Sequence, residues 1–159
     1  MTNLDFADEL VPRPSDGGHL TYEQAEAIER YVVKVLGRLD LSYWRVWVAK
    51  DLPPEGVLLM IEPTDGRRLA MLYVSEDWWD NQSPAQKCVD ITHECLHLAH
   101  HDQEQVIRHF KDTTGDIGSY PMSLVWDQFR LATERMVDSL SYVLAPHMPP
   151  WKDPAKKDA

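Results

Sequence analysis

Apolar residues recur at helical spacing through residues 22–38 of this 159-residue chain. Thr21 and Gln24 form a capping box in front of this stripe, since each side chain can bond to the backbone N–H of the other residue. We therefore expect the first helix to begin at Tyr22 and to end near Arg38.

Three apolar, β-prone segments follow, at residues 43–49, 57–62 and 68–75. The link Thr64–Arg67 contains Asp-Gly, which is a strong signal for a tight turn between paired strands. Pro53–Gly56 separates the first two segments. The pattern predicts a small antiparallel meander.

Two longer helices are predicted after the strands. Ser83 can cap the first, Pro84 suits its first turn and Gln86 can close a capping box. This helix should run to about His101 and continue through Phe110. The last helix should run from about Met122 to Leu144, before three prolines end it: Pro146, Pro149 and Pro150.

The length suits a single α+β domain, which we place at residues 20–150. Residues 1–19 are rich in Pro, Gly and Asp, and we expect them to be loose. The Lys-rich residues 151–159 are expected to form a disordered tail.

Charge and composition argue against two classes of protein, nucleic-acid binders and membrane-spanning proteins. The formal net charge is −10 and the acidic residues are spread out, which argues against nucleic-acid binding. No apolar run is long enough to span a membrane, and the acidic N-terminus lacks a secretory signal, so we expect a cytoplasmic protein. Cys88 and Cys95 lie two helical turns apart, about 10 Å, and should stay reduced.

The segment His93–His97 reads H-E-x-x-H inside a predicted helix. Residues four apart project from the same helix face, so His93 and His97 can point two imidazoles at one zinc ion. Glu94 can then take a proton from water on the open side of the ion.

The motif arises by chance in roughly two chains per hundred of this composition, so its context matters. Apolar residues flank the histidines on both sides, which predicts a buried helix. A buried His-Glu-His stripe without partners would be costly, and a metal ion removes that cost. The flanking residues are Ile91, Cys95 and Leu98 on one side, and Val89, Leu96 and Ala99 on the other.

A catalytic zinc site normally has a third protein ligand. His100 lies about 4.5 Å further along the helix axis than His97, so one straight helix cannot bring both to the same ion. Glu134 and Asp138 share one face of the last helix and are better candidates, although a solvated acidic pair has the same pattern. Three alternatives stay open: His101, Asp102 and Glu104.

These motifs resemble the gluzincin clan of zinc metallopeptidases, in which a glutamate on a later helix is the third ligand and E-x-x-x-D is typical. The resemblance covers about residues 22–145 and implies that Glu134 binds zinc while Asp138 hydrogen-bonds His93. Residues 132–140 are also similar to metallopeptidases encoded by bacteriophages of actinobacteria. The fold implied is zincin-like, with a small antiparallel-type sheet packed on the active-site helix and the C-terminal glutamate helix.

The implied activity is zinc-dependent hydrolysis of a polypeptide substrate, in the host cytoplasm if a phage encodes the chain. Glu94 would be the general base, and Tyr142 is our candidate for stabilising the oxyanion, with Tyr120 and His147 as alternatives. Zincins pair substrate with an edge strand, for which we expect Leu69–Val74.

The competing hypothesis is a catalytically silent zincin-fold binding or structural protein with a structural zinc, serving in phage assembly or host takeover. Glu94 argues against it, because a structural site needs no general base. Cobalt or manganese could occupy the same ligands. The sequence predicts no oligomeric state.

Overall fold

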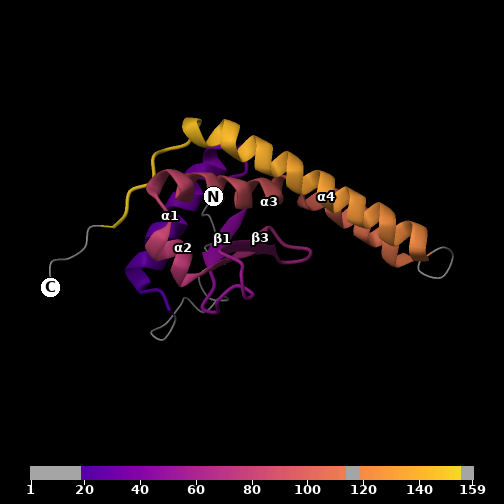
Figure 1. The fold of residues 1–159 in the computed structure, drawn as a ribbon, viewed down its shortest axis with the longest axis horizontal. Coiled ribbons are helices and arrows are strands. Elements are labelled where there is room, and N and C mark those ends of the chain that lie inside the picture. Colours follow the sequence, from indigo (N-terminus) through magenta and orange to yellow (C-terminus); the bar gives the residue numbers. More distant parts are fainter. Residues whose placement is uncertain (1–18, 114–118, 155–159) are drawn as a thin grey trace, which may run out of the picture.

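The computed structural model describes residues 19–113 and 119–154, with backbone alone for residues 119–121 (Figure 1). The described part is α+β, with four α-helices and a three-stranded mixed sheet. The elements in chain order are α1 (Tyr22–Arg38), β1 (Arg45–Val48), β2 (Leu59–Pro63), β3 (Leu69–Val74), α2 (Glu76–Asn81), α3 (Pro84–Thr113), α4 (Ser119–Leu144) and the 3-10 turn η1 (Ala145–His147).

The predicted helix starts are largely confirmed. α1 has the expected bounds, and both hydrogen bonds of the Thr21–Gln24 capping box are present. Ser83 Oγ accepts from the Gln86 N–H, but the Gln86 side chain donates to Asp90 instead of closing a second box. The pattern did not predict α2, which Ser75 caps.

The predicted antiparallel meander is wrong for β1. The strand order is β1-β3-β2, with β1 parallel to β3 and only β2 antiparallel to it. Residues 49–58 cross from one edge of the sheet to the other, and such a link has room to pass the two strand spacings, about 10 Å. A ten-residue link does not force its two strands to be neighbours, as a tight turn does.

The β2–β3 hairpin forms as predicted. Gly66 takes a φ of 69° in the turn, which suits a residue without Cβ. β3 is the central strand and β2 lies at a sheet edge, next to α3. The expectation that Leu69–Val74 would be the free edge for substrate is therefore wrong, and Leu59–Pro63 has that position.

The core lies between one face of the sheet and the helices α1 and α3. Ile28, Leu72, Trp78 and Ile91 are among its fully buried side chains. Figure 1 shows α4 lying along α3, and the two helices extend together beyond the sheet. Most apolar side chains that stay exposed past residue 120 are on α4.

The segment after Pro150 is not a disordered tail over its described part. Trp151 is 5% exposed and packs edge-to-face against Tyr31, Trp78 and Trp79. Residues 155–159 lie outside the described residues. So do residues 1–18 of the N-terminal segment expected to be loose.

Lys87 connects this C-terminal segment to α3. Its side chain is 4% exposed, and its ammonium lies 3.1 Å from an Asp153 carboxylate oxygen. Three indole rings also surround it, with the nearest centroid, that of Trp79, at 4.9 Å.

At the other end of the described chain, His19 forms a hydrogen bond with the Val74 carbonyl.

Two predictions from composition concern the cysteines and membrane-spanning helices. Cys88 and Cys95 are both free and buried, as predicted. Among the described helices, none combines the length and apolar character needed to cross a bilayer. The compartment stays a prediction.

Candidate metal centre

α3 presents His93 and His97 one turn apart on the same face. Their Nε2 atoms lie 3.0 Å from each other. Both side chains are about one-fifth exposed, at 20% and 19%. The spacing predicted from the motif is therefore present.

The core fixes this part of α3. Cys95 and Leu98 are 1% exposed and Leu96 is 6% exposed, so the flanks of the motif are buried as expected. Val89 is half-buried, whereas Ala99 is exposed, contrary to the prediction. The histidines consequently sit on a helix that has little freedom to rotate.

α4 brings Glu134 opposite the two histidines. Its Oε2 lies 3.9 Å from His93 Nε2 and 3.7 Å from His97 Nε2. A point equidistant from three atoms at these spacings lies about 2.1 Å from each, which is the length of a zinc–nitrogen bond. His93, His97 and Glu134, the triad, could therefore hold a metal ion.

Asp138 lies behind His93. Its Oδ1 is 3.1 Å from His93 Nδ1, so Nδ1–H can donate to the carboxylate. That bond leaves Nε2, the atom facing Glu134, with a free lone pair. A carboxylate behind a metal-binding histidine commonly fixes the ring in this way.

Glu94, which follows His93 on α3, is buried beside the triad. It is 9% exposed, and its Oε2 accepts a 2.7 Å hydrogen bond from the Ile61 N–H of β2. Burial raises the pKa of Glu94 to about 8, although the Ile61 bond acts in the opposite direction. The neighbouring Glu134 carboxylate raises the pKa further.

Burial has the opposite effect on His97. It lowers the pKa of this imidazole to about 4, and the nearby His93 and His100 contribute to the lowering. His97 is therefore neutral at pH 7, and a neutral imidazole is the form that can bind a metal ion.

Several residues weighed from the sequence lie away from the triad. α3 continues unbroken through His100 and His101, and the His101 ring packs edge-to-face on Trp44. His100 Nδ1 bonds to the Gln103 side chain. Asp102 forms a bidentate pair with Arg68.

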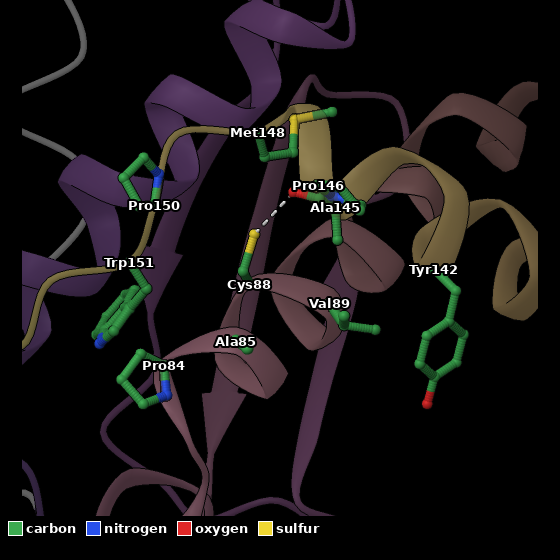
Figure 2. A pocket seen from close by; sticks show the side chains of 10 residues that line it. All are labelled: Pro84, Ala85, Cys88, Val89, Tyr142, Ala145, Pro146, Met148, Pro150 and Trp151. Carbon is green, nitrogen blue, oxygen red and sulfur yellow. Dashed lines mark hydrogen bonds between the residues drawn. The ribbon is translucent and has the colours of Figure 1, made fainter.

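The structure does not bring Tyr142 to the triad. Tyr142 is 63% exposed and lines a separate, mostly apolar pocket of about 480 Å³ between the start of α3 and the chain after α4. Figure 2 shows it there, facing Val89 across the pocket mouth. On α4 it comes two turns after Glu134, about 12 Å along the axis. The expectation that Tyr142 stabilises an oxyanion is therefore wrong for this structure.

A cleft of about 750 Å³ opens over the triad, between β2 on one side and α3 and α4 on the other. It contains residues that the sequence reading missed: Arg108, Trp126 and Arg130. Their spacing carried a signal, because Trp126, Arg130 and Glu134 follow one another every four residues. The sequence alone does not show that this face of α4 lines the cleft.

No protein-family model, no curated protein and no solved structure matches this chain. The resemblance to the gluzincin clan accordingly rests on the motifs and spacings given above. The fold and the placement of the triad come from this chain alone.

Proposed function

We propose that this protein is a zinc-dependent hydrolase of peptide bonds, with His93, His97 and Glu134 as ligands and Glu94 as general base. The observation that supports it most is the meeting of three ligand atoms within 3.9 Å, from two helices, beside a buried glutamate. Two imidazoles and one carboxylate, with a position left open, are the usual ligands of a catalytic zinc.

When bound, zinc would supply a Lewis acid and lower the pKa of a water molecule at its open position. Glu94 would take the proton from the attacking water and deliver it to the leaving amine. Its Oε2 accepts a hydrogen bond from the Ile61 N–H, which leaves the second carboxylate oxygen for the proton transfer. Asp138 would hold His93 in the required tautomer.

β2 supports a polypeptide as the substrate. Ser75 donates to the Leu58 carbonyl and Thr64 donates to the Leu69 carbonyl, which fixes the alternation of bonds between β2 and β3. Leu59 and Ile61 therefore direct their backbone groups to the open edge, which lines the cleft. The Ile61 N–H at this edge already donates to Glu94, so a peptide would pair with the Leu59 N–H and the two carbonyls. An extended peptide could pair with this edge above the triad.

Metal content tests the site. The chain is purified without chelators or affinity metals, and bound metal is measured by mass spectrometry. We expect one zinc per wild-type chain and a loss in Glu134→Ala. Glu104→Ala is the matched control, because Glu104 lines the same cleft outside the triad. Zinc that survives Glu134→Ala but not Glu104→Ala would refute the ligand assignment.

Hydrolysis of unfolded casein by wild type and Glu94→Gln tests the activity. The amide oxygen that this substitution introduces can still accept from the Ile61 N–H, so the variant keeps the hydrogen bond and loses only the base. We expect normal zinc content and no cleavage. Equal cleavage by both proteins would exclude Glu94 as the base.

The alternative is a silent structural zinc site, and one observation favours it. The Glu94 carboxylate already joins α3 to β2 through Ile61, so it has a structural role without any reaction. Zinc binding by wild type with no cleavage of casein or of a peptide library would select this alternative.

A further inference from the structure

The cleft continues beyond the triad, along both helices. On α4, Arg130 and Trp126 lie one and two turns from Glu134 on the face that lines the cleft. On α3, Glu104 and Arg108 line the opposite wall. One end of the cleft thus holds the triad, and the other holds two arginines and a tryptophan.

This second end is cationic in a chain with a net charge of −10. The Arg108 guanidinium lies 5.8 Å from the centroid of the Trp126 ring, and the Lys111 ammonium lies 5.5 Å from it. Among the described residues, neither Arg108 nor Arg130 forms an ion pair with a carboxylate.

Outside the triad and Glu94, the cleft is lined by two acidic residues, Glu62 of β2 and Glu104 of α3, and Glu104 is the one beside the arginines. It is close enough for Arg108 and Arg130 to favour its ionised form, yet burial outweighs them and raises its pKa. Glu104 carries at most one negative charge, so it cannot neutralise both guanidinium groups. Charge complementarity favours an acidic ligand at this place.

The distance to the triad is set by α4. Arg130 lies about 6 Å and Trp126 about 12 Å from Glu134 along the helix axis. An extended peptide advances about 3.4 Å per residue, so this interval corresponds to two to four residues.

The direction is set by β2. The Ile61 N–H of β2 donates to Glu94, next to the triad. In the turn after β2, the Asp65 carboxylate accepts from the Gln105 side chain at 3.1 Å, eleven residues further along α3. β2 therefore runs from the triad towards the arginines. Antiparallel pairing is the commoner arrangement, and it would put the residues before the cut bond at the arginine end.

We propose that Arg108 and Arg130 select substrates with an acidic side chain two to four residues before the cut bond, an inference that rests on the proposed peptidase function. Arg108 and Trp126 both line the cleft, and the cation–π contact between them restricts the freedom of the Arg108 guanidinium. The substrate class is a polypeptide with Asp or Glu on the N-terminal side of the cleavage site.

A library of proteome-derived peptides, digested by the zinc-loaded protein and read by mass spectrometry, tests this. The variants are R108Q/R130Q and R130E, with R135Q as the matched control, since Arg135 is an exposed arginine of α4 outside the cleft. We expect wild type and R135Q to favour Asp or Glu at one of the three positions by roughly three- to tenfold, the size of one or two exposed ion pairs.

R108Q/R130Q should lose the acidic preference, seen as an equal rate for acidic and neutral contexts within that variant, and R130E should favour Lys or Arg at that position. The preference should also weaken in 1 M salt, where the screening length is about 3 Å. An acidic preference that is absent, lies after the cut bond or survives in R108Q/R130Q overturns the inference while the peptidase function stands. Absence of any cleavage that depends on Glu94 overturns both.

Discussion

The two helices that build the candidate site lie in opposite surroundings. The part of α3 around the histidines is enclosed by the sheet and α1, and Ile91 and Leu98 there are at most 1% exposed. On α4 the Glu134 side chain is 47% exposed and that of Asp138 is 65% exposed. Glu94 and the histidines are therefore positioned by the core, whereas the α4 carboxylates depend on how α4 packs along α3.

This difference has an energetic consequence. A group held by a packed core keeps its place without a ligand, because any movement would open a cavity. A carboxylate on a half-exposed helix gains little from its surroundings and is ordered mainly by the partner it binds. A metal ion shared between α3 and α4 would therefore stabilise α4 more than the rest of the chain.

Removal of a core side chain should give the largest effect. Trp78→Ala should lower the free energy of unfolding by about 3–5 kcal/mol, because a fully buried indole is replaced by a cavity. Val125→Ala on α4, where the side chain is 52% exposed, should change it by less than about 0.5 kcal/mol. Urea denaturation measures both, and similar losses in the two variants would contradict the contrast.

Zinc should act on α4 in particular. At a hundredfold excess over its dissociation constant, the ion should add about 2.7 kcal/mol of stability. In hydrogen exchange, amides of α4 near Glu134 should slow most, while those of α1 should change little because the core already protects them. Glu134→Ala should remove the effect. Equal slowing in α1 and α4 would count against a selective link.

The pH dependence of stability tests the burial of Glu94. The pKa of Glu94 is raised to about 8 in the folded protein, so the unfolded chain loses this proton first as the pH rises from about 4.5. Metal-free wild type should thus lose stability relative to Glu94→Gln between pH 4.5 and 8, with a constant difference above that.

Thermal melts of the metal-free proteins measure this difference. Glu94→Gln should melt a few degrees above wild type at pH 8 and close to it at pH 4.5. Parallel curves for wild type and Glu94→Gln would mean that the buried carboxylate carries no such penalty.

The smallest effect concerns the residue behind His93. Asp138→Ala should weaken zinc binding by about 10–100-fold, because the His93 ring loses the acceptor that fixes its tautomer. Asp138→Asn should lose less, since the amide oxygen can still accept from Nδ1–H. Competition with a chromogenic chelator gives both affinities. Unchanged affinity in Asp138→Ala would show that the core alone orients His93.

The sequence predicted the features that depend on near neighbours. The bounds of α1 followed from Thr21 and Gln24, and the β2–β3 hairpin followed from Asp65 and Gly66, because caps and turns are decided within a few residues. The histidine spacing is a property of one helix. Glu134 required the resemblance to a known clan, since E-x-x-x-D alone does not say what the helix faces.

The features that failed depend on distant partners. The sequence of residues 43–49 does not determine that β1 pairs in parallel with β3. Because of this pairing, β3 is the central strand and β2 lies at the edge. Trp151 looked like part of a polar tail, because its burial depends on rings that come from α1 and α2. Arg108 and Trp126 became neighbours only when α3 and α4 folded back on each other.

The enclosure of Lys87 determines where this chain can be shortened. A version ending at Pro150 would lack one of the three indoles and the carboxylate of Asp153, leaving an ammonium in an apolar pocket without its counter-ion. Such an isolated charge is costly, so that version should be harder to produce in folded form than one ending at Pro154. Tags and fusion partners therefore belong after residue 154, where attachment leaves the surroundings of Lys87 complete.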